Sequence, residues 1–177
     1  MARCKICKAK FEPKYFLQKA CFEPKCLADW ARLERESKAD KVHSVKKRKM
    51  KDNDKSLRNR EAQKAFNSFI RARDSALPCV SCGRHHSGKY DAGHYRSRGA
   101  FPELRFNELN CHKQCSPCNT QLSGNIANYR PILLERIGID NLEFIEGPHE
   151  PKKYTCAELK EIELHYKLKL KELIALT

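Results

Sequence analysis

Two tight cysteine pairs constrain this chain more than any other feature of its sequence. Cys79 and Cys82 enclose two residues, as do Cys115 and Cys118, and 32 residues separate the two pairs. Pairs of this kind predict a tetrahedral zinc site with four thiolate ligands. A filled four-thiolate shell has no position open to water, so this zinc would stabilise the fold and would take no part in a reaction.

A second set of four cysteines lies near the N-terminus. Cys4 and Cys7 form another short pair, and Cys21 and Cys26 follow with a looser spacing. A segment this short cannot fold on a hydrophobic core alone, and a metal site can supply the missing stability. We therefore expect a second structural zinc ion, held by an N-terminal Cys4 zinc finger at residues 1–29.

Composition narrows the choice of compartment and partner. The chain has 177 residues, of which ten are cysteine and 33% are charged, and no apolar run is long enough to cross a membrane. These features favour a reducing cytosol, where paired cysteines bind metal more readily than they form disulfides. The net charge of +14 favours nucleic acid as the partner, rather than a membrane surface. The plain alternative is a soluble basic protein with no such partner.

Most of the excess charge lies on a basic arm at residues 30–74. Residues 31–73 contain 15 Lys or Arg and 6 Asp or Glu, and the arm has neither Pro nor Gly, so we expect a long basic helix. Four of its residues are expected to contact DNA phosphates: Lys46, Lys47, Arg48 and Lys49. Apolar residues recur at helical spacing from Ala62 to Ile70, so the end of the arm should pack on the next domain. The alternative is a solvated linker helix.

Residues 75–177 are expected to form the main domain. Gly and Pro interrupt residues 75–125, where short runs with Tyr, His and Phe predict strands and tight turns. A short helix is expected around Ile132–Ile137, ended by Gly138, and a loop should follow it as far as Pro151.

The C-terminal part of the sequence predicts one more helix. Thr155 and Glu158 have the spacing of a capping box, and apolar residues follow at intervals of three or four. We expect this helix to close the core of the main domain rather than to bind a partner. Together these elements predict an α+β fold.

Polar residues between the two later cysteine pairs carry the candidate chemistry. His94, Asn110 and Asn119 are spaced like the active-site residues of HNH, or ββα-metal, nucleases. The resemblance covers residues 79–125 and implies a zinc-stapled ββα-metal core of HNH or treble-clef-like type. It also implies that His94 is the general base, that Asn110 orients His94 and that Asn119 binds a catalytic Mg²⁺ or Mn²⁺.

The sequence departs from that family at one position. The acidic metal ligand usually directly precedes the His, but here Gly93 stands there and Asp91 is three residues before His94. In a regular strand Asp91 and His94 would point to opposite faces. A bulge at Ala92–Gly93 would turn both inward, and the alternative is that His112 supplies the missing ligand. A purely structural imidazole is the remaining alternative for His94.

Three arginines flank the proposed base and would grip phosphates on either side of a cut: Arg96, Arg98 and Arg105. Surface solvation is the alternative for them. Cys111 and Cys156 belong to neither cysteine set, and burial as small apolar groups is their expected role.

A closer resemblance extends over most of the chain. The strings that carry it are AFNSFIR at 65–71, LPCVSCG at 77–83, DAGHY at 91–95, LRFNELN at 104–110, HKQC at 112–115, CN at 118–119 and SGN at 123–125. With the N-terminal cysteine set and the basic arm, they resemble the phage lambda NinG family, also called Rap.

This second resemblance implies a structure-specific endonuclease that cuts Holliday junctions or D-loops during phage recombination. Its expected partner is branched DNA and not a membrane, and its expected location is the cytoplasm of the bacterial host of a phage or prophage. A junction-cutting enzyme usually acts as a homodimer, because two symmetric strands must be cut, but the sequence does not decide this point.

Two other classes of protein share parts of the pattern. A non-catalytic zinc-finger DNA-binding protein would use both Cys4 sites and the basic helix, and a zinc-built adaptor would bind protein. Neither class needs His94, Asn110 and Asn119 at nuclease spacing. We therefore expect a nuclease with two structural Zn²⁺ ions and a catalytic Mg²⁺ or Mn²⁺.

Overall fold

The computed structural model describes residues 1–175 and confirms a mixed α+β protein with two small sheets. The chain forms two compact units, one at residues 1–52 and the other from Asn53 onward, so the division falls within the predicted arm. None of the helices in the described part is both long enough and apolar enough to span a bilayer.

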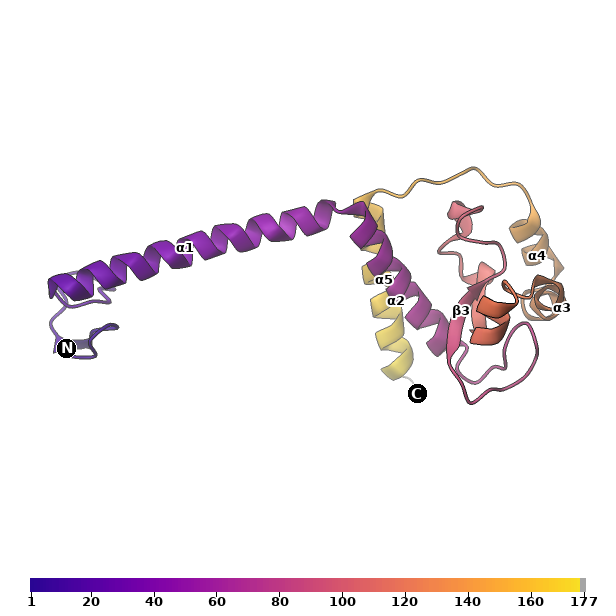
Figure 1. The fold of residues 1–177 in the computed structure, drawn as a ribbon, viewed down its shortest axis with the longest axis horizontal. Coiled ribbons are helices and arrows are strands. Elements are labelled where there is room, and N and C mark those ends of the chain that lie inside the picture. Colours follow the sequence, from indigo (N-terminus) through magenta and orange to yellow (C-terminus); the bar gives the residue numbers. More distant parts are fainter. Residues whose placement is uncertain (176–177) are drawn as a thin grey trace. The chain divides into compact units, whose positions relative to one another are not determined.

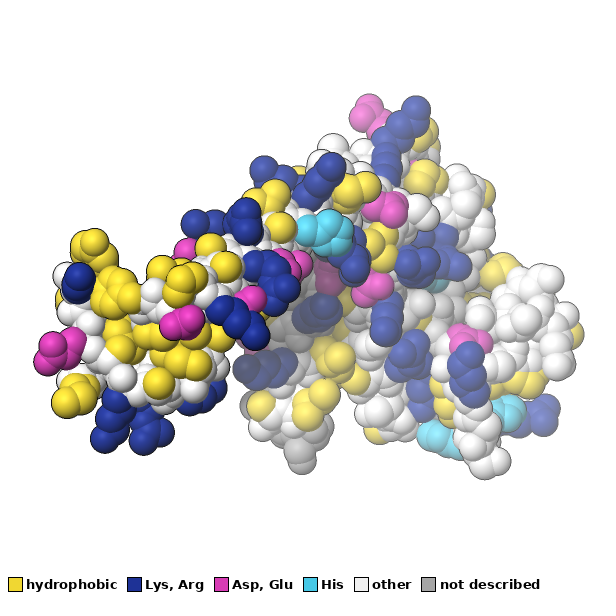
Figure 2. Space-filling view, turned by 60° about the vertical axis from the view of Figure 1, so that its left-hand side comes forward, with side chains coloured by type: hydrophobic (Ala, Val, Ile, Leu, Met, Phe, Trp, Pro, Cys, Tyr) yellow, Lys and Arg dark blue, Asp and Glu magenta, His cyan; other side chains and the backbone are white. Residues whose placement is uncertain are grey.

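The first unit is a small finger that continues into a long helix (Figure 1). Strands β1 (Ala2–Arg3) and β2 (Lys10–Phe11) form an antiparallel pair, and helix α1 spans Pro24–Asn53. The helix begins earlier than expected, so Cys26 lies in its first turn and is the buried residue of α1. Hydrophobic side chains gather at the surface of the finger, and Lys and Arg follow along α1 (Figure 2).

The second unit begins with a packed pair of helices, α2 (Lys55–Arg73) and α5 (Cys156–Ala175). Asp54 caps α2, since its carboxylate accepts the Leu57 N–H over 3.0 Å. The predicted apolar stripe of α2 is buried, with Phe66 0% exposed and packed edge-on against Tyr166 of α5. This confirms that the end of the arm packs on the following domain.

The capping box is also confirmed. The Thr155 N–H donates to the Glu158 carboxylate over 2.8 Å, and the Glu158 N–H donates to Thr155 Oγ1 over 3.2 Å. The residues of α5 that pack with α2 and the sheet are Ile162, Tyr166, Leu170 and Leu173, and Leu159 is also buried. This helix therefore closes the core, as predicted.

A two-stranded antiparallel sheet lies beside α2. Strand β3 (Tyr90–His94) pairs with β4 (Cys111–Cys115), and two short 3₁₀ turns, η1 (Pro102–Leu104) and η2 (Glu108–Asn110), lie in the connection. The register runs without interruption from Tyr90 opposite Cys115 to His94 opposite Cys111. The predicted bulge at Ala92–Gly93 is therefore wrong, because both residues take ordinary places in the ladder.

A π-helical turn, η3 (Pro117–Gln121), follows β4, and helices α3 (Ile126–Ile137) and α4 (Ile139–Glu146) complete the unit. Gly138 ends α3 as predicted, with a φ of +79° that an L side chain rarely adopts. Helix α4 was expected to be loop. Its Leu142 and Ile145 are fully buried, but eight residues are too few to show a clear helical period.

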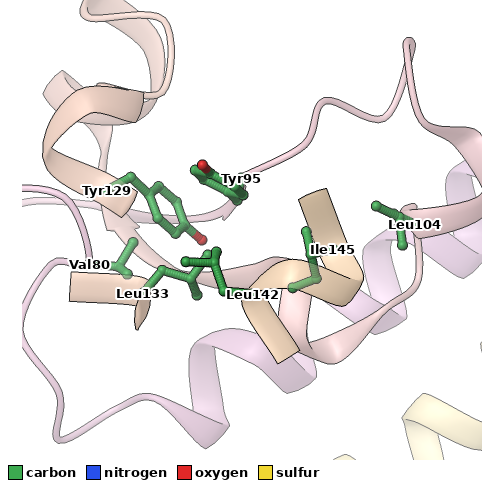
Figure 3. Packing of buried hydrophobic residues seen from close by; sticks show 7 residues of the cluster. All are labelled: Val80, Tyr95, Leu104, Tyr129, Leu133, Leu142 and Ile145. Atoms are coloured by element: carbon green, nitrogen blue, oxygen red, sulfur yellow. The ribbon is translucent and has the colours of Figure 1, made fainter. Parts of the chain in front are cut away.

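Figure 3 shows the core that these helices cover. The buried side chains that meet there are Val80, Tyr95, Leu104, Tyr129, Leu133, Leu142 and Ile145. The Tyr129 hydroxyl donates to the Gly93 carbonyl over 3.0 Å, so the core is tied directly to β3. The residues on and after β3 are thus held by buried contacts.

Candidate functional site

The four later cysteines converge from three local structures. Cys79 and Cys82 lie on the turn after α2, Cys115 ends β4 and Cys118 lies in η3, and the four sulfur atoms are within 4.8 Å of one another. Burial opposes ionisation of Cys79, but backbone N–H groups, led by that of Cys115 at 3.3 Å, outweigh it and lower its pKa to about 7. These features fit a zinc site, because zinc binds thiolates in tetrahedral geometry.

The N-terminal cysteines converge in the same way. The sulfur atoms of Cys4, Cys7, Cys21 and Cys26 also lie within 4.8 Å of one another. The Cys21 N–H donates to Cys4 Sγ over 3.4 Å, and such backbone bonds outweigh desolvation and lower the pKa of Cys4 to about 6. Both predicted cysteine sets are therefore assembled, and each could bind one zinc ion.

A separate cavity of about 470 Å³ lies beside the second cysteine cluster. Asp91 and His94 from β3 and Asn119 from η3 all line it. The register of β3 is regular, yet both Asp91 and His94 border this space. The structure thus brings together three of the predicted site residues, and it does so without the predicted bulge.

Asp91 and Asn119 are in direct contact. Asn119 Nδ2 donates to Asp91 Oδ2 over 3.2 Å, and Ser116 Oγ donates to the same oxygen over 3.0 Å. Lys89 Nζ lies 3.5 Å from the other carboxylate oxygen. A carboxylate and an amide oxygen are ligands that Mg²⁺ accepts, so this pair fits a hard divalent cation.

The imidazole of His94 is held on both sides. Its Nε2 donates to the Arg105 carbonyl over 2.9 Å, and its Nδ1 lies 3.6 Å from Cys111 Sγ. Burial, reinforced by the charges of Arg98 and Arg105, lowers the pKa of His94 to about 4. The ring is therefore neutral at pH 7, and its lone pair is on Nδ1, which faces the Cys111 thiol.

Asn110 does not orient His94, and this prediction is wrong. Its side chain is fully buried, where Oδ1 accepts the Arg96 N–H over 2.8 Å and Nδ2 donates to the carbonyls of Arg96 and Leu104 over 3.0 and 3.1 Å. Asn110 thus holds the backbone of the loop that follows His94. The orienting bond to His94 comes from a backbone carbonyl, which no side-chain pattern reveals.

His112 is not a candidate metal ligand, and this prediction is also wrong. Its Nδ1 accepts from Arg73 Nη2 over 3.1 Å and lies 3.5 Å from Asp74 Oδ2, while its Nε2 donates to the Leu109 carbonyl over 3.1 Å. Both ring nitrogens are thus used inside the fold, because His112 points to the face of β4 opposite to its neighbour Cys111.

The three flanking arginines do not share one role. Arg96 donates to the Glu146 carbonyl over 3.0 Å and stacks on Phe101, so it is a structural residue and not the expected phosphate contact. Arg98 is exposed and lines the cavity of His94. Arg105 donates to Gln63 Oε1 over 2.8 Å, next to this cavity.

Comparison with known proteins decides the family. The family model described as Bacteriophage Lambda NinG protein matches residues 1–175. The chain is 42% identical over 190 residues to Protein ninG of Salmonella phage P22, covering 97% of this chain and 93% of that relative. It is also 42% identical to Protein ninG of Escherichia phage lambda, covering 97% and 92%. No solved structure matches the chain significantly.

The chain belongs to the NinG family. The family match runs through both units of the chain. The relatives are bacteriophage proteins, so a phage origin of the family is shown.

Packing explains why position 93 of this NinG-family chain is a glycine. A Cβ atom at that position would overlap the side chain of Gln114 on the neighbouring strand. An acidic residue there, as the HNH nucleases have, would not fit against Gln114. The nearest acid on β3 is Asp91, whose partner in η3 is Asn119.

Several lining residues of the cavity were not expected from the sequence, among them Asn67 and Arg71 of α2. They are four residues apart and therefore share one face of the helix, away from the buried stripe of Phe66 and Ile70. That polar face was a usable signal. The predicted DNA contacts at residues 46–49 are exposed on α1, in the first unit.

Proposed function

We propose that this chain is a metal-dependent endonuclease that cuts branched recombination intermediates of DNA, such as Holliday junctions and D-loops. The observation that carries the proposal is the cavity lined by Asp91, His94 and Asn119. It is supported by the order of the local elements, in which an antiparallel strand pair and a short helical turn carry these residues next to a four-cysteine cluster. A ββα-metal core would have its elements in this order, which supports the proposal.

Each side chain would have a separate task. Asp91 and Asn119 would hold a Mg²⁺ or Mn²⁺ ion through their side-chain oxygens; the two side chains are already in contact, through Asn119 Nδ2 and Asp91 Oδ2, and the Asn119 amide would turn its oxygen to the ion. Such an ion, when bound, neutralises negative charge that develops on the phosphate and on the leaving oxygen. His94 would accept a proton from the attacking water at Nδ1, since its Nε2 is committed to the Arg105 carbonyl.

The zinc sites would act as a scaffold in this proposal. Cys115 and Cys118 flank the point where β4 passes into η3, so a zinc ion there would keep Asn119 in register with Asp91. The preference for branched DNA follows from the resemblance to the NinG family, and so does action in the bacterial cytoplasm during phage recombination. A homodimer would let two such sites cut two symmetric strands.

A second candidate is a non-catalytic zinc-stabilised DNA-binding protein. One observation favours it: Nδ1 of His94 already lies 3.6 Å from the thiol of Cys111, so both ring nitrogens have protein partners. A thiol is a weak hydrogen-bond donor, and its contact would have to open for His94 to reach water. The same experiment separates the two candidates.

The deciding experiment is a nicking assay on a four-way junction with Mg²⁺ or Mn²⁺, and linear duplex serves as the substrate control. Wild type should nick the junction, and His94→Ala should lose cutting by at least about 100-fold while it keeps junction binding. His165→Ala is the matched control, because His165 is exposed on α5, and it should cut like wild type.

Since His94 packs against Phe66 with ring centroids 5.9 Å apart, His94→Gln is tested in parallel and the zinc content of each variant is measured. Equal cutting by His94 variants that are folded would remove the base assignment. Absence of cutting by wild type, with binding intact, would favour the second candidate.

A further inference from the structure

A second hollow lies along α2, next to the cavity of His94, and has a volume of about 550 Å³. Its lining is polar throughout and consists of Ser56, Asn59, Arg60, Gln63, Lys64, Asn67, Arg71, Arg98 and Arg105. We call it the α2 groove. None of its residues was among the site residues expected from the sequence except Arg98 and Arg105.

The spacing of the α2 residues makes the groove a continuous stripe. Ser56, Arg60, Lys64, Asn67 and Arg71 follow one another at intervals of three or four, so they lie on one face of the helix. From Ser56 to Arg71 the helix rises by about 22 Å. One strand of nucleic acid carries about six phosphates over that length, at about 3.4 Å of axial rise each.

The charge of the α2 groove has one sign. Five of its lining residues are cationic and none is acidic. Within residues 1–175, the salt bridges of the structure include none that pairs one of these five cations with a carboxylate. Uncompensated cations held side by side create a potential that attracts a polyanion.

Two arginines of the groove are held in position by hydrogen bonds. Arg105 is fixed by its bond to Gln63 Oε1, and Arg71 Nη2 donates to Ser68 Oγ over 3.2 Å. Burial lowers the pKa of Arg105, and the adjacent charge of Arg98 lowers it further. An arginine fixed in this way offers its remaining N–H groups to a phosphate at little entropic cost.

The α2 groove and the cavity of His94 adjoin each other. Asn67, Arg71 and Arg98 line both of them. A chain of phosphates that lies in the groove would therefore lead to Asp91 and His94. A small free anion would need only one or two of the cations, whereas the stripe extends along four turns of α2.

We propose that the α2 groove is a backbone-binding track that holds the sugar–phosphate backbone of one nucleic-acid strand and delivers it to the cavity of His94. Contacts to phosphate give no base readout, so binding in the track is independent of sequence. The groove lies within the second unit, and its action does not require the arm of the first. The delivery step depends on the proposed function, but binding of the strand does not.

The test compares two pairs of substitutions that remove equal charge. Arg60→Gln with Lys64→Gln removes two cations from the middle of the track, and Lys153→Gln with Lys171→Gln removes two exposed cations outside it. Binding of a labelled single strand and of a four-way junction is followed by fluorescence anisotropy over a range of KCl concentrations. EDTA is present, so that no cutting occurs.

The track pair should weaken binding of both DNAs by on the order of tenfold for each phosphate that it no longer binds near 0.1 M salt, and should lower the salt slope by about two. The control pair should bind like wild type. Equally weakened binding by the two pairs, or unchanged binding by the track pair, would overturn the track. Circular dichroism verifies folding, and Gln has nearly the helix propensity of Arg and Lys.

Failure of the backbone-binding track and failure of the nuclease proposal would give different results. If wild type cuts no DNA but only the track pair loses binding, the track stands and the nuclease does not. If wild type cuts the junction, and the track pair binds and cuts it equally well, the nuclease stands and the track does not.

Discussion

Asn119 Nδ2 donates a hydrogen bond to Asp91 Oδ2 over 3.2 Å, although the two residues are 28 positions apart in the sequence. Asp91 belongs to β3 and Asn119 to η3, directly after Cys118 of the second cysteine cluster. The contact places two oxygen-bearing side chains at the edge of the cavity that His94 lines. A scaffold metal and a candidate reaction metal would thus lie on neighbouring parts of one small hairpin.

Asp91→Ala should abolish metal-dependent cutting and leave DNA binding intact. Removal of the acidic side chain from the cavity lining takes away the main attraction for a divalent cation, and we expect a fall in cutting rate on the order of 100-fold or more. The measurement is the junction-nicking rate as a function of Mn²⁺ concentration. Asp140→Ala, exposed on α4, is the control. Unchanged metal dependence would rule out Asp91 as a ligand.

Metal analysis should find two zinc ions per chain. Cys7→Ser should lose one zinc and leave the unfolding of the second unit unchanged, because Cys7 belongs to the finger of the first. Cys115→Ser should lose the other zinc and destabilise the second unit, in which Cys115 is buried. Elemental analysis and thermal unfolding measure both effects. One zinc per wild-type chain would contradict the assignment of two sites.

Asn110→Ala should destabilise the second unit by about 2 to 4 kcal/mol, because three backbone groups lose a buried partner. Urea unfolding gives the value. Asn128→Ala is a suitable comparison, since Asn128 is exposed, and its effect should stay within about 0.5 kcal/mol. Similar effects of the two variants would mean that Asn110 does not hold the loop after His94.

The ion pair of Glu146 should make stability depend on pH. Hydrogen bonds from Arg130 and Tyr95 lower the pKa of Glu146 from its ordinary 4.5 to about 2. A lowered pKa means that the contribution is full above about pH 4.5 and is lost as the pH falls toward 2. Glu146→Gln should lower Tm by about 2 to 5 °C at pH 7.

The difference in Tm between wild type and Glu146→Gln should shrink as the pH falls through that range. A difference that is constant from pH 7 down to pH 2 would show that the charge of Glu146 does not contribute. The readout is thermal unfolding of both proteins at matched ionic strength.

Neutralising the basic run of α1 should weaken binding to every DNA and reduce the salt slope by about one unit for each phosphate that the arm no longer neutralises. The change is Lys46, Lys47, Arg48 and Lys49 to Gln, and the charge-preserving control exchanges Lys for Arg and Arg for Lys at the same positions. Anisotropy titrations in KCl provide the slope. A slope equal to that of wild type would make α1 a spacer rather than a DNA-binding element.

The sequence by itself determined the features that depend on neighbouring residues. The cysteine spacings predicted two metal clusters, the Thr155–Glu158 pair predicted the start of α5, and Gly138 predicted the end of α3. The helix start and the helix end follow from local backbone chemistry, so a short stretch of residues is enough to predict them, and the cysteine spacings follow from the ligand preference of zinc. The apolar stripe of α2 was visible for the same reason, although its partner helix was not named.

Only the tertiary structure decided the partner of each polar side chain. His112 is held by Arg73 and Asp74, and Asn110 by Arg96 and Leu104, and all of these bonds form after α2, the loops and β4 have packed together. Two polar residues of the same type can fit a spacing pattern equally well. In the fold their side chains can still point to opposite faces of the sheet, because alternate residues of a strand do so. Packing against Gln114 likewise explains why position 93 is glycine, while Asp91 is the carboxylate that lines the cavity.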